Sequence, residues 1–278
     1  MKSTLFWEEL AILDYAYLDT EGRVWGNSAR VQATLTAPGL DEGDMVVDFS
    51  VMKQFLRARL EERSDHTLWV NPEQWPVSTE HGTVELRTPH LVYRAPEQAF
   101  FHFQKDPVDF LTSQLQTQLY DTFPERHFQL HLTLSQPSGP RIQYTHGLRK
   151  HAGHCQRLLH GHLSPLAQPF APFQNEVFTF LEKKYHGKHF VSQQDVVRQD
   201  RERLVQAYES GQGEFQLEMN SGLCVVFDHE TTIEQIAQTV QAQLERYFPL
   251  LQGAFYLREG LTKGSIIQIN NLITHGPQ

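Results

Sequence analysis

Hydrophobic and polar positions follow a similar plan in the two halves of the chain. In the first half, apolar and polar residues alternate over residues 29–36, which is typical of a strand with one buried face. Another largely apolar run covers residues 10–18, and the turn formers Glu21-Gly22 lie between the two runs. We therefore expect a hairpin of two strands, at residues 10–18 and 24–37.

Two amphipathic helices are predicted after this hairpin. The first, at residues 48–62, is indicated by apolar residues at helical spacing: Val51, Phe55, Leu56 and Leu60. The second covers residues 106–123, because Asp106 is a suitable N-cap and Pro107 suits the first helical position. Extended segments are expected at residues 84–103 and 127–134.

The second half repeats this order less regularly. A long amphipathic helix is predicted at residues 231–248, with Thr231 or Thr232 as its cap and Glu234 in its first turn. Strands are expected at residues 141–146, 213–219, 222–227 and 254–257. The mixed polarity of residues 165–203 predicts no definite element.

Both halves close with a capped helix followed by a strand, and Phe123-Pro124 and Phe248-Pro249 end the two helices. We interpret this as a diverged tandem duplication. The turn formers at residues 137–140 mark the boundary, which gives domains at residues 1–136 and 137–278. The predicted fold class is α+β, with an antiparallel sheet and two helices on one face of it in each domain.

Composition narrows the classes of function. The residues are 40 % hydrophobic and 21 % charged, as in globular proteins, and the net charge of −9 argues against a general nucleic-acid binder. No apolar run is long enough for a transmembrane helix, and the early acidic residues Glu8-Glu9 do not fit a secretory signal. Two cysteines make no disulfide framework, so we expect a cytoplasmic protein with free thiols, and Cys224 in an apolar run belongs to the core.

The chemistry is expected among the 15 histidines, many of which lie between His146 and His189. On a strand, His160 and His162 point to the same side and can bind one ion, and His146 on a neighbouring strand can complete the set. Three imidazoles with an open fourth position are typical of a catalytic zinc site. His151 and His154 are alternatives for the third ligand, whereas residues 186–189 (HGKH) are predicted to lie on the surface.

Cys155 followed by His160-Gly161-His162, with His146 upstream, resembles the 6-pyruvoyltetrahydropterin synthase and 6-carboxytetrahydropterin synthase family. The resemblance implies that His146, His160 and His162 hold Zn²⁺. It also implies that Cys155 takes part in proton transfer at the side chain of the pterin.

Two further segments carry the same resemblance. Residues 43–53, GDMVVDFSVMK, are similar to the family's Gly-Met-Val-x-Asp-Phe-x-x-Leu-Lys with one residue inserted, and Ser64-Asp65-His66 is similar to its Leu-Asp-His. The resemblance implies that Asp65 and His66 assist proton transfer, the carboxylate orienting the imidazole.

The end of the chain resembles the family as well. Residues 231–234 are similar to its Pro-Thr-x-Glu, and residues 255–259 to the strand whose last residue anchors the pterin ring. Glu259 is therefore expected to accept two parallel hydrogen bonds from the ring, with Thr232 beside it. Lys53, Arg149 and Arg157 are candidates for contacting a triphosphate.

The motifs are divided between the halves. The first half has Trp25-Gly26-Asn27 in the place of His160-Gly161-His162, and the second lacks the Asp-Phe motif that contains Lys53. We expect one composite site, with zinc from the second half and Asp65-His66 from the first. Asp228-His229 is the alternative pair, although its position favours a role at the start of a helix.

The resemblance implies tandem T-fold domains that assemble through sheet edges into a homo-oligomer. It implies a lyase acting on 7,8-dihydroneopterin triphosphate, with 6-carboxytetrahydropterin, in a deazapurine pathway, or 6-pyruvoyltetrahydropterin as product. A purine or pterin hydrolase of the same fold is a second hypothesis. A non-catalytic zinc-binding assembly protein is a third.

Overall fold

The computed structural model describes residues 2–136, 141–147, 164–165 and 174–270. The first half contains the helices α1 (Phe49–Ser64) and α2 (Pro107–Thr122). Its strands are β1 (Ser3–Leu18), β2 (Val24–Ala37), β3 (Leu68–Val70), β4 (Val77–Glu80), β5 (Thr83–Arg87), β6 (Leu91–Pro96), β7 (Phe100–His102) and β8 (Gln129–Ser135).

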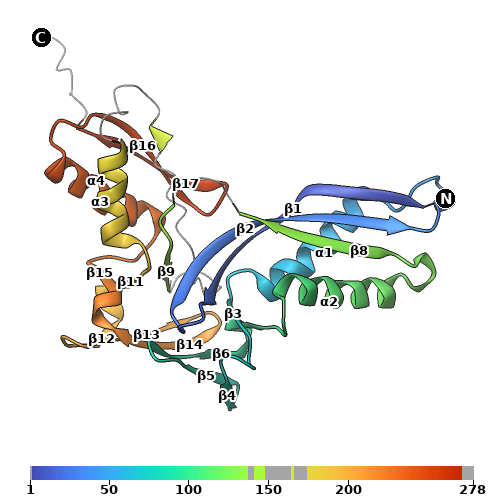
Figure 1. Cartoon of the computed structure of the whole chain (residues 1–278), viewed down its shortest axis with the longest axis horizontal. Coiled ribbons are helices and arrows are strands. Elements are labelled where there is room, and N and C mark those ends of the chain that lie inside the picture. The colour runs from blue at the N-terminus through green and yellow to red at the C-terminus, as the bar shows by residue number, and fades with distance from the viewer. Residues whose placement is uncertain (1, 137–140, 148–163, 166–173, 271–278) are drawn as a thin grey trace, which may run out of the picture.

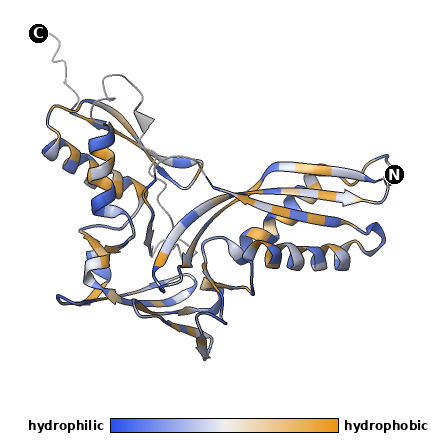
Figure 2. Cartoon of the chain, viewed as in Figure 1, coloured by the Kyte–Doolittle hydropathy of each residue, from blue (hydrophilic) through white to orange (hydrophobic). Residues whose placement is uncertain are grey.

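The main sheet of the first half has the order β7-β3-β1-β2-β8. The β1–β2 hairpin and the β2–β8 pair are antiparallel, whereas β1–β3 and β3–β7 are parallel. Both helices lie on one side of this sheet (Figure 1). Hydrophobic and hydrophilic positions alternate along β2, so that one face is available for packing (Figure 2).

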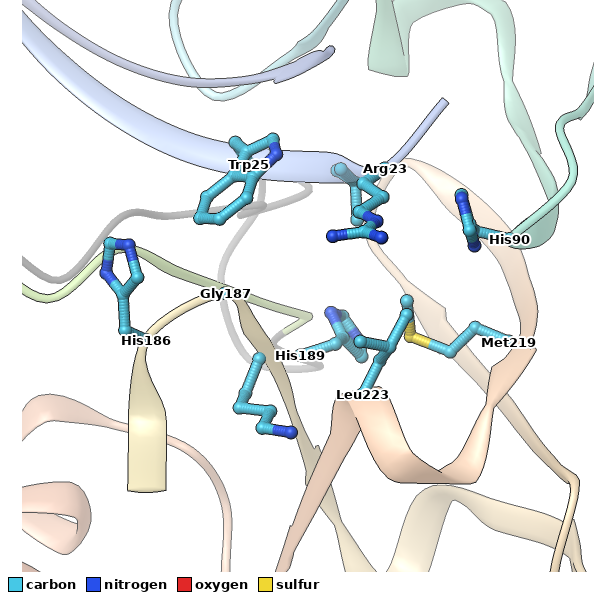
Figure 3. A pocket seen from close by; sticks show the side chains of 10 residues that line it. Arg23, Trp25, His90, His186, Gly187, His189, Met219 and Leu223 are labelled. Carbon is cyan, nitrogen blue, oxygen red and sulfur yellow. The ribbon is translucent and has the colours of Figure 1, made fainter. Parts of the chain in front are cut away.

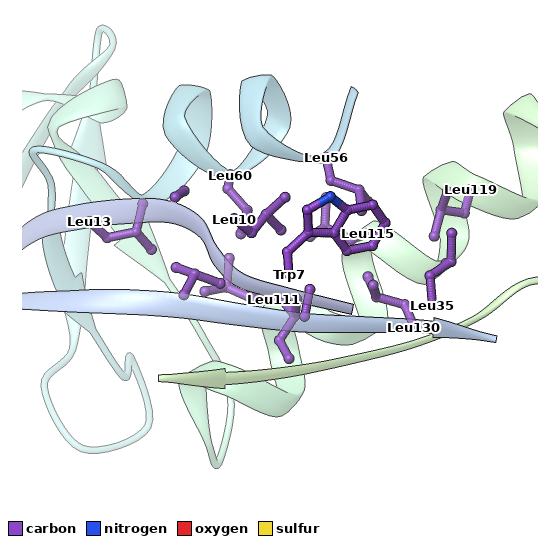
Figure 4. Packing of buried hydrophobic residues seen from close by; sticks show 14 of the residues in the cluster. Trp7, Leu10, Leu13, Leu35, Leu56, Leu60, Leu111, Leu115, Leu119 and Leu130 are labelled. Atoms are coloured by element: carbon purple, nitrogen blue, oxygen red, sulfur yellow. The ribbon is translucent and has the colours of Figure 1, made fainter. Parts of the chain in front are cut away.

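The core of this half lies between the sheet and the two helices. Figure 4 shows Trp7 and Leu35 of the hairpin facing leucines of both helices. The helical residues buried there recur at intervals of four: Leu56 and Leu60 in α1, and Leu111, Leu115 and Leu119 in α2. The predicted helices are confirmed, including the N-cap Asp106, and Asp48 caps α1. Val51, which was counted in the helical spacing, is exposed, and Met52 is buried instead.

The second half contains the helices α3 (Gln174–Tyr185) and α4 (Ile233–Tyr247). Its strands are β9 (Tyr144–His146), β10 (Ser164–Pro165), β11 (Lys188–Ser192), β12 (Val196–Gln199), β13 (Arg203–Ser210), β14 (Gly213–Asn220), β15 (Cys224–Phe227), β16 (Gly253–Glu259) and β17 (Lys263–Ile269). The strands β15-β11-β9 form a parallel sheet, and β10-β16-β17 form an antiparallel one.

The two halves have the same order of elements. From α1 to β8 the chain forms a helix, four strands, a 3₁₀ turn at Glu97–Ala99, a strand, a helix and a strand. From α3 to β16 it repeats that order, with the corresponding 3₁₀ turn at Ser221–Leu223. The last helix of each half ends in the same backbone conformation, at Phe123 (φ −132°, ψ 59°) and Phe248 (φ −129°, ψ 66°). This repetition is what a tandem duplication predicts.

The halves join through a six-stranded antiparallel sheet of order β12-β13-β14-β6-β5-β4. The corresponding strands β6 and β14 pair at its centre, from Leu91 opposite Met219 to Arg94 opposite Gln216. Tyr93 and Leu217 are buried in a shared core on this sheet. The two halves therefore share a hydrophobic core and a sheet, and they are not two separate domains connected only by a linker.

The structure corrects the sequence prediction in two further places. Residues 174–203, within the segment to which no element was assigned, contain α3, β11 and β12 and the start of β13. His189 was expected on the surface, but it is buried, because it lies on β11 between β9 and β15. Cys224 is half-buried, and this burial raises the pKa of its thiol to about 12.

Candidate active site

His146 is fully buried at the end of β9. Its Nδ1 lies 2.7 Å from the backbone oxygen of Thr231 and 3.0 Å from the hydroxyl of the same residue. A carbonyl oxygen only accepts hydrogen bonds, so Nδ1 carries a proton, and Nε2 is the ring nitrogen that remains for another partner. A hydrogen bond from one ring nitrogen to a backbone carbonyl is the usual way to orient a metal-binding histidine.

Glu259 lies beside this ring. Its Oε1 is 3.7 Å from His146 Nε2, and the residue is only 5 % exposed. Glu259 ends β16, and Gly260 follows it with a φ of 70°, a conformation that glycine adopts without strain. The end of β16 thus places a buried carboxylate next to Nε2 of His146.

The turn after Glu259 packs against the first half. A Cβ atom added to Gly260 would lie 2.7 Å from Oδ1 of Asp14, which is buried in β1. Lys263, at the start of β17, places its Nζ 3.5 Å from Oδ2 of the same carboxylate. Asp14 therefore connects the turn after the Glu259 strand to the first half.

Asp65 and His66 bind to the other side of Asp14. The backbone N–H of Asp14 donates to Asp65 Oδ1 at 2.8 Å, and the backbone N–H of His66 donates to the Asp14 carbonyl at 2.7 Å. His66 Nδ1 lies 3.2 Å from Asp65 Oδ1, and both side chains are partly exposed. Their placement follows from the end of α1, where His66 adopts a left-handed φ of 57°.

The second half has the same arrangement with different side chains. The backbone N–H of Gln143 donates to His186 Nδ1 at 3.1 Å, and the N–H of Gly187 donates to the Gln143 carbonyl at 2.7 Å. His186 and Gly187 follow α3 as Asp65 and His66 follow α1, and Gly187 has a left-handed φ of 68°. His186-Gly187 is therefore the structural counterpart of Asp65-His66.

This counterpart faces Trp25 of the first half. The rings of Trp25 and His186 are 5.3 Å apart, and a Cβ on Gly187 would lie 3.1 Å from the indole. Figure 3 shows both residues on the wall of a cleft of about 140 Å³ between the halves, with Arg23 and His90 further along it. Nearby, the side chain of Gln143 donates to the Gly26 carbonyl at 3.0 Å.

The structure brings some of the expected site residues together and separates others. His146 and Glu259 are adjacent, and Asp65-His66 is connected to them through Asp14. Thr232 caps α4, with its hydroxyl 3.4 Å from the Gln235 N–H. Lys53 lies in the first turns of α1, about 17 Å along the helix from the end that carries Asp65.

The remaining candidates lie outside the described residues: Cys155, His160, His162, His151, His154, Arg149 and Arg157. The described part of the chain contains no group of three or more metal-binding side chains around a common point. Asp228 and His229 are exposed between β15 and α4. Sequence reasoning missed Asp14, which belongs to no motif, and its only available signal was an acidic residue within an apolar strand. It also missed the role of the Thr231 carbonyl, although Thr231 lies in the motif of residues 231–234.

Residues 11–106 match the family model described as 6-pyruvoyl tetrahydropterin synthase. This match lies within the first half of the chain. The match starts in β1, includes Asp65 and His66, and ends at the N-cap of α2. The resemblance is thereby confirmed for the motifs of the first half, at residues 43–53 and 64–66.

Several solved structures are similar to part of the chain at low sequence identity. The 6-pyruvoyl tetrahydropterin synthase of Plasmodium vivax is 17 % identical with a TM-score of 0.42, covering 50 % of this chain and 94 % of its own. The Plasmodium falciparum enzyme is 12 % identical with a TM-score of 0.36, and the match covers 49 % of this chain and 99 % of its own. An uncharacterized protein from Wolinella succinogenes is 12 % identical with a TM-score of 0.32, and the match covers 50 % of this chain and 96 % of its own.

The match to the family model is confined to residues 11–106. No curated protein matches the chain. Among the described residues, no helix combines the length and the apolar character that crossing a membrane requires.

Proposed function

We propose that the protein is a zinc-dependent lyase that acts on a reduced pterin, with 7,8-dihydroneopterin triphosphate as substrate. The product is 6-carboxy-5,6,7,8-tetrahydropterin or 6-pyruvoyltetrahydropterin. The observation that carries this proposal is the buried pair His146–Glu259, in which the Thr231 carbonyl fixes the imidazole with Nε2 toward the carboxylate.

The side chain of His146 fits a zinc ligand. Its ring is buried and oriented by a backbone carbonyl, as the ligands of catalytic zinc ions are. His160 and His162 would complete the set. When bound, zinc supplies a Lewis acid that lowers the pKa of hydroxyl groups on the pterin side chain.

The other residues bind the substrate and move protons. Glu259 anchors the pterin ring by accepting hydrogen bonds from its N–H groups. His66 holds a proton on Nδ1 next to Asp65 Oδ1 and the Asp14 carbonyl, and it exchanges a proton with the substrate through Nε2. Cys155 is the second proton-transfer group, acting between the side chain and the ring.

The internal repeat supports a site that draws on both halves. Trp25-Gly26-Asn27 occupies the sequence position of the zinc motif in the first half, and Trp25 contacts His186-Gly187 of the second half. The segment Trp25-Gly26-Asn27 of one half thus contacts the counterpart of Asp65-His66 in the other half. By the symmetry of the repeat, the zinc motif of the second half would face Asp65-His66 of the first. We propose that the active protein is a cytoplasmic homo-oligomer.

A metal analysis combined with a turnover assay tests the proposal. We expect about one zinc ion per chain in the wild type, none in His160→Ala, and full zinc without turnover in Cys155→Ala. Wild-type protein without zinc would refute the central claim. Zinc without turnover of 7,8-dihydroneopterin triphosphate would identify a non-catalytic zinc protein, and turnover of purine substrates alone would identify a hydrolase.

A further inference from the structure

The first half contains a pocket at the position that the His146–Glu259 pair occupies in the second half. Tyr17 pairs with Trp69 across β1 and β3, as His146 pairs with Phe190 across β9 and β11. Leu134 follows Phe123 at the same separation along the chain as Glu259 follows Phe248. Tyr17 and Leu134 thus replace the histidine and the carboxylate, and both line this pocket.

The pocket has a volume of about 400 Å³, which lies in the range of small-molecule sites. Its walls are aromatic and aliphatic, with uncharged amides among them: Tyr15, Tyr17, Leu18, Asn27, Trp69, Asn71, Gln74, Trp75, Phe103, Pro107, Val108, Leu134 and Gln136. None of these described residues is charged. Burying an ion against such walls would cost several kcal/mol, so the pocket excludes anions and cations.

The base of the pocket is rigid. Tyr15 stacks on Trp69 with ring centroids 3.9 Å apart and an angle of 14° between the planes, and both residues are buried. The Asn27 side chain donates to the Tyr15 hydroxyl at 2.7 Å, and burial raises the pKa of that hydroxyl to about 12, so it stays neutral. A flat ligand therefore meets a preformed aromatic surface and loses little free energy to reorganisation.

Two residues of the wall have a buried polar atom without a hydrogen-bond partner in the described structure. These atoms are Oδ1 of Asn27, an acceptor, and Nε1 of Trp75, a donor. A buried polar atom left unpaired costs about 1–3 kcal/mol. Both atoms are closed off from the pocket, so a ring with an N–H and an acceptor on its edge meets instead the amides that line it, such as Asn71 and Gln74.

We propose that this first-half aromatic pocket is a second binding site, specific for an uncharged planar heteroaromatic ring and independent of zinc. Aromatic stacking supplies the affinity, and the amides around the rim orient the ring. The replacement of His146 and Glu259 by Tyr17 and Leu134 removes the groups for metal binding and for a charged anchor. The pocket therefore binds a ligand without transforming it.

Isothermal titration calorimetry of the full chain with quinazolin-4(3H)-one, a neutral bicyclic ring with an N–H and a carbonyl, tests this proposal. For a ligand of this size we expect a Kd of about 0.1–1 mM. The anion 1-naphthoate should bind at least ten times more weakly. No detectable binding of quinazolin-4(3H)-one, or equal binding of both compounds, would overturn the proposal.

Variants locate the ligand. Trp75→Ala removes part of the wall, and Leu134→Glu places a charge in it; each should weaken binding at least tenfold. Tyr120→Ala, at an exposed aromatic residue of α2 outside the pocket, is the control and should leave the Kd unchanged. Circular dichroism confirms folding, and if both pocket variants unfold, Tyr17→Ala is measured in their place.

Two further measurements distinguish this site from the proposed active site. Chelation of zinc and the Glu259→Gln substitution should leave the Kd for quinazolin-4(3H)-one unchanged. If either abolishes binding, the ring binds beside His146 and the inference is wrong. An intact Kd in a protein without pterin turnover would refute the proposed function and leave this inference standing.

Discussion

His146 and Glu259 lie side by side, with Nε2 and Oε1 3.7 Å apart, although they belong to two different sheets of the second half. His146 comes from the parallel sheet and Glu259 from the antiparallel one. The Thr231 carbonyl, just before α4, orients the ring between them. A buried imidazole and a buried carboxylate are thus held ready for a ligand by three separate elements.

Removal of the His146 imidazole should abolish tight zinc binding. The loss even of an outer-shell partner weakens metal binding by about 10–100-fold, so His146→Ala should weaken it by at least about 100-fold. Zinc content after dialysis against a weak chelator measures this effect. His131→Ala, on an exposed position of β8, is the control and should keep its zinc. A folded His146→Ala protein with full zinc content would show that this histidine is not a ligand.

Substitution of Glu259 by glutamine should weaken pterin binding and leave zinc binding unchanged. A hydrogen bond to a charged group contributes about 1.5–3 kcal/mol, so Glu259→Gln should lower kcat/KM by about 10–100-fold. Steady-state kinetics with 7,8-dihydroneopterin triphosphate checks this, and zinc content should remain at the wild-type level. Glu214→Gln, at an exposed residue, serves as control. Loss of zinc in Glu259→Gln would instead make the carboxylate a metal ligand.

His66→Gly should separate activity from stability. His66 has a φ of 57°, which glycine adopts freely, and its counterpart in the second half is Gly187. The free energy of unfolding should therefore change by no more than about 1 kcal/mol, while the loss of a proton-transfer group lowers kcat by about 10²–10⁴-fold. Lys105→Gly, at an exposed residue with a φ of 60°, should leave kcat unchanged. Full turnover by His66→Gly would exclude His66 from the mechanism.

Gly260→Ala should loosen the contact between the halves. The new Cβ would lie 2.7 Å from Asp14 Oδ1, and the residue has a left-handed φ of 70°. Gly82→Ala is a matched control, since Gly82 has a φ of 80° and nothing within 4 Å of the added atom. We expect Gly82→Ala to cost about 1 kcal/mol and Gly260→Ala about 1–3 kcal/mol more, measured by urea unfolding. Equal costs would show that the turn moves freely away from Asp14.

The buried His189 should make the protein sensitive to acid. Its Nδ1 lies 2.8 Å from the Thr145 hydroxyl, and its Nε2 lies 2.8 Å from the side-chain Oε1 of Gln206. Burial lowers its pKa from 6.5 to about 4. Between these values the unfolded state binds more protons, so stability is full above pH 6.5 and falls toward pH 4. The loss should reach about 3 kcal/mol.

Urea unfolding between pH 7 and pH 4.5 measures this dependence. Leucine is the residue at the corresponding position of the first half, Leu68. The His189→Leu variant should be less stable at pH 7 because Thr145 and Gln206 lose their hydrogen-bond partner. It should also show a shallower decline with acid. An unchanged slope would assign the acid sensitivity to other groups, such as His102 and His186, whose pKa values burial also lowers.

Local chemistry in the sequence predicted the first half well. Alternation and helical spacing located β2, α1 and α2, because one face of each of these elements packs against a single core and the other meets solvent. The caps Asp48 and Asp106 were visible for the same local reason. The strand β11 was not predictable, because it is buried between two parallel neighbours and its pattern has no period of two. The helix α3 was overlooked, although it buries Val177, Leu181 and Tyr185 at intervals of four.

By itself, the sequence determined the tandem plan, the family of the first half and the residue types of the candidate site, since these depend on short motifs and on local periodicity. Only the tertiary structure decided that Glu259 meets His146, that Asp14 connects Asp65-His66 to the second half, and that β6 and β14 join the halves in one sheet. Such contacts join residues far apart in the chain. They arise from hydrogen-bond register and from the burial of whole faces, which no local pattern of residues specifies.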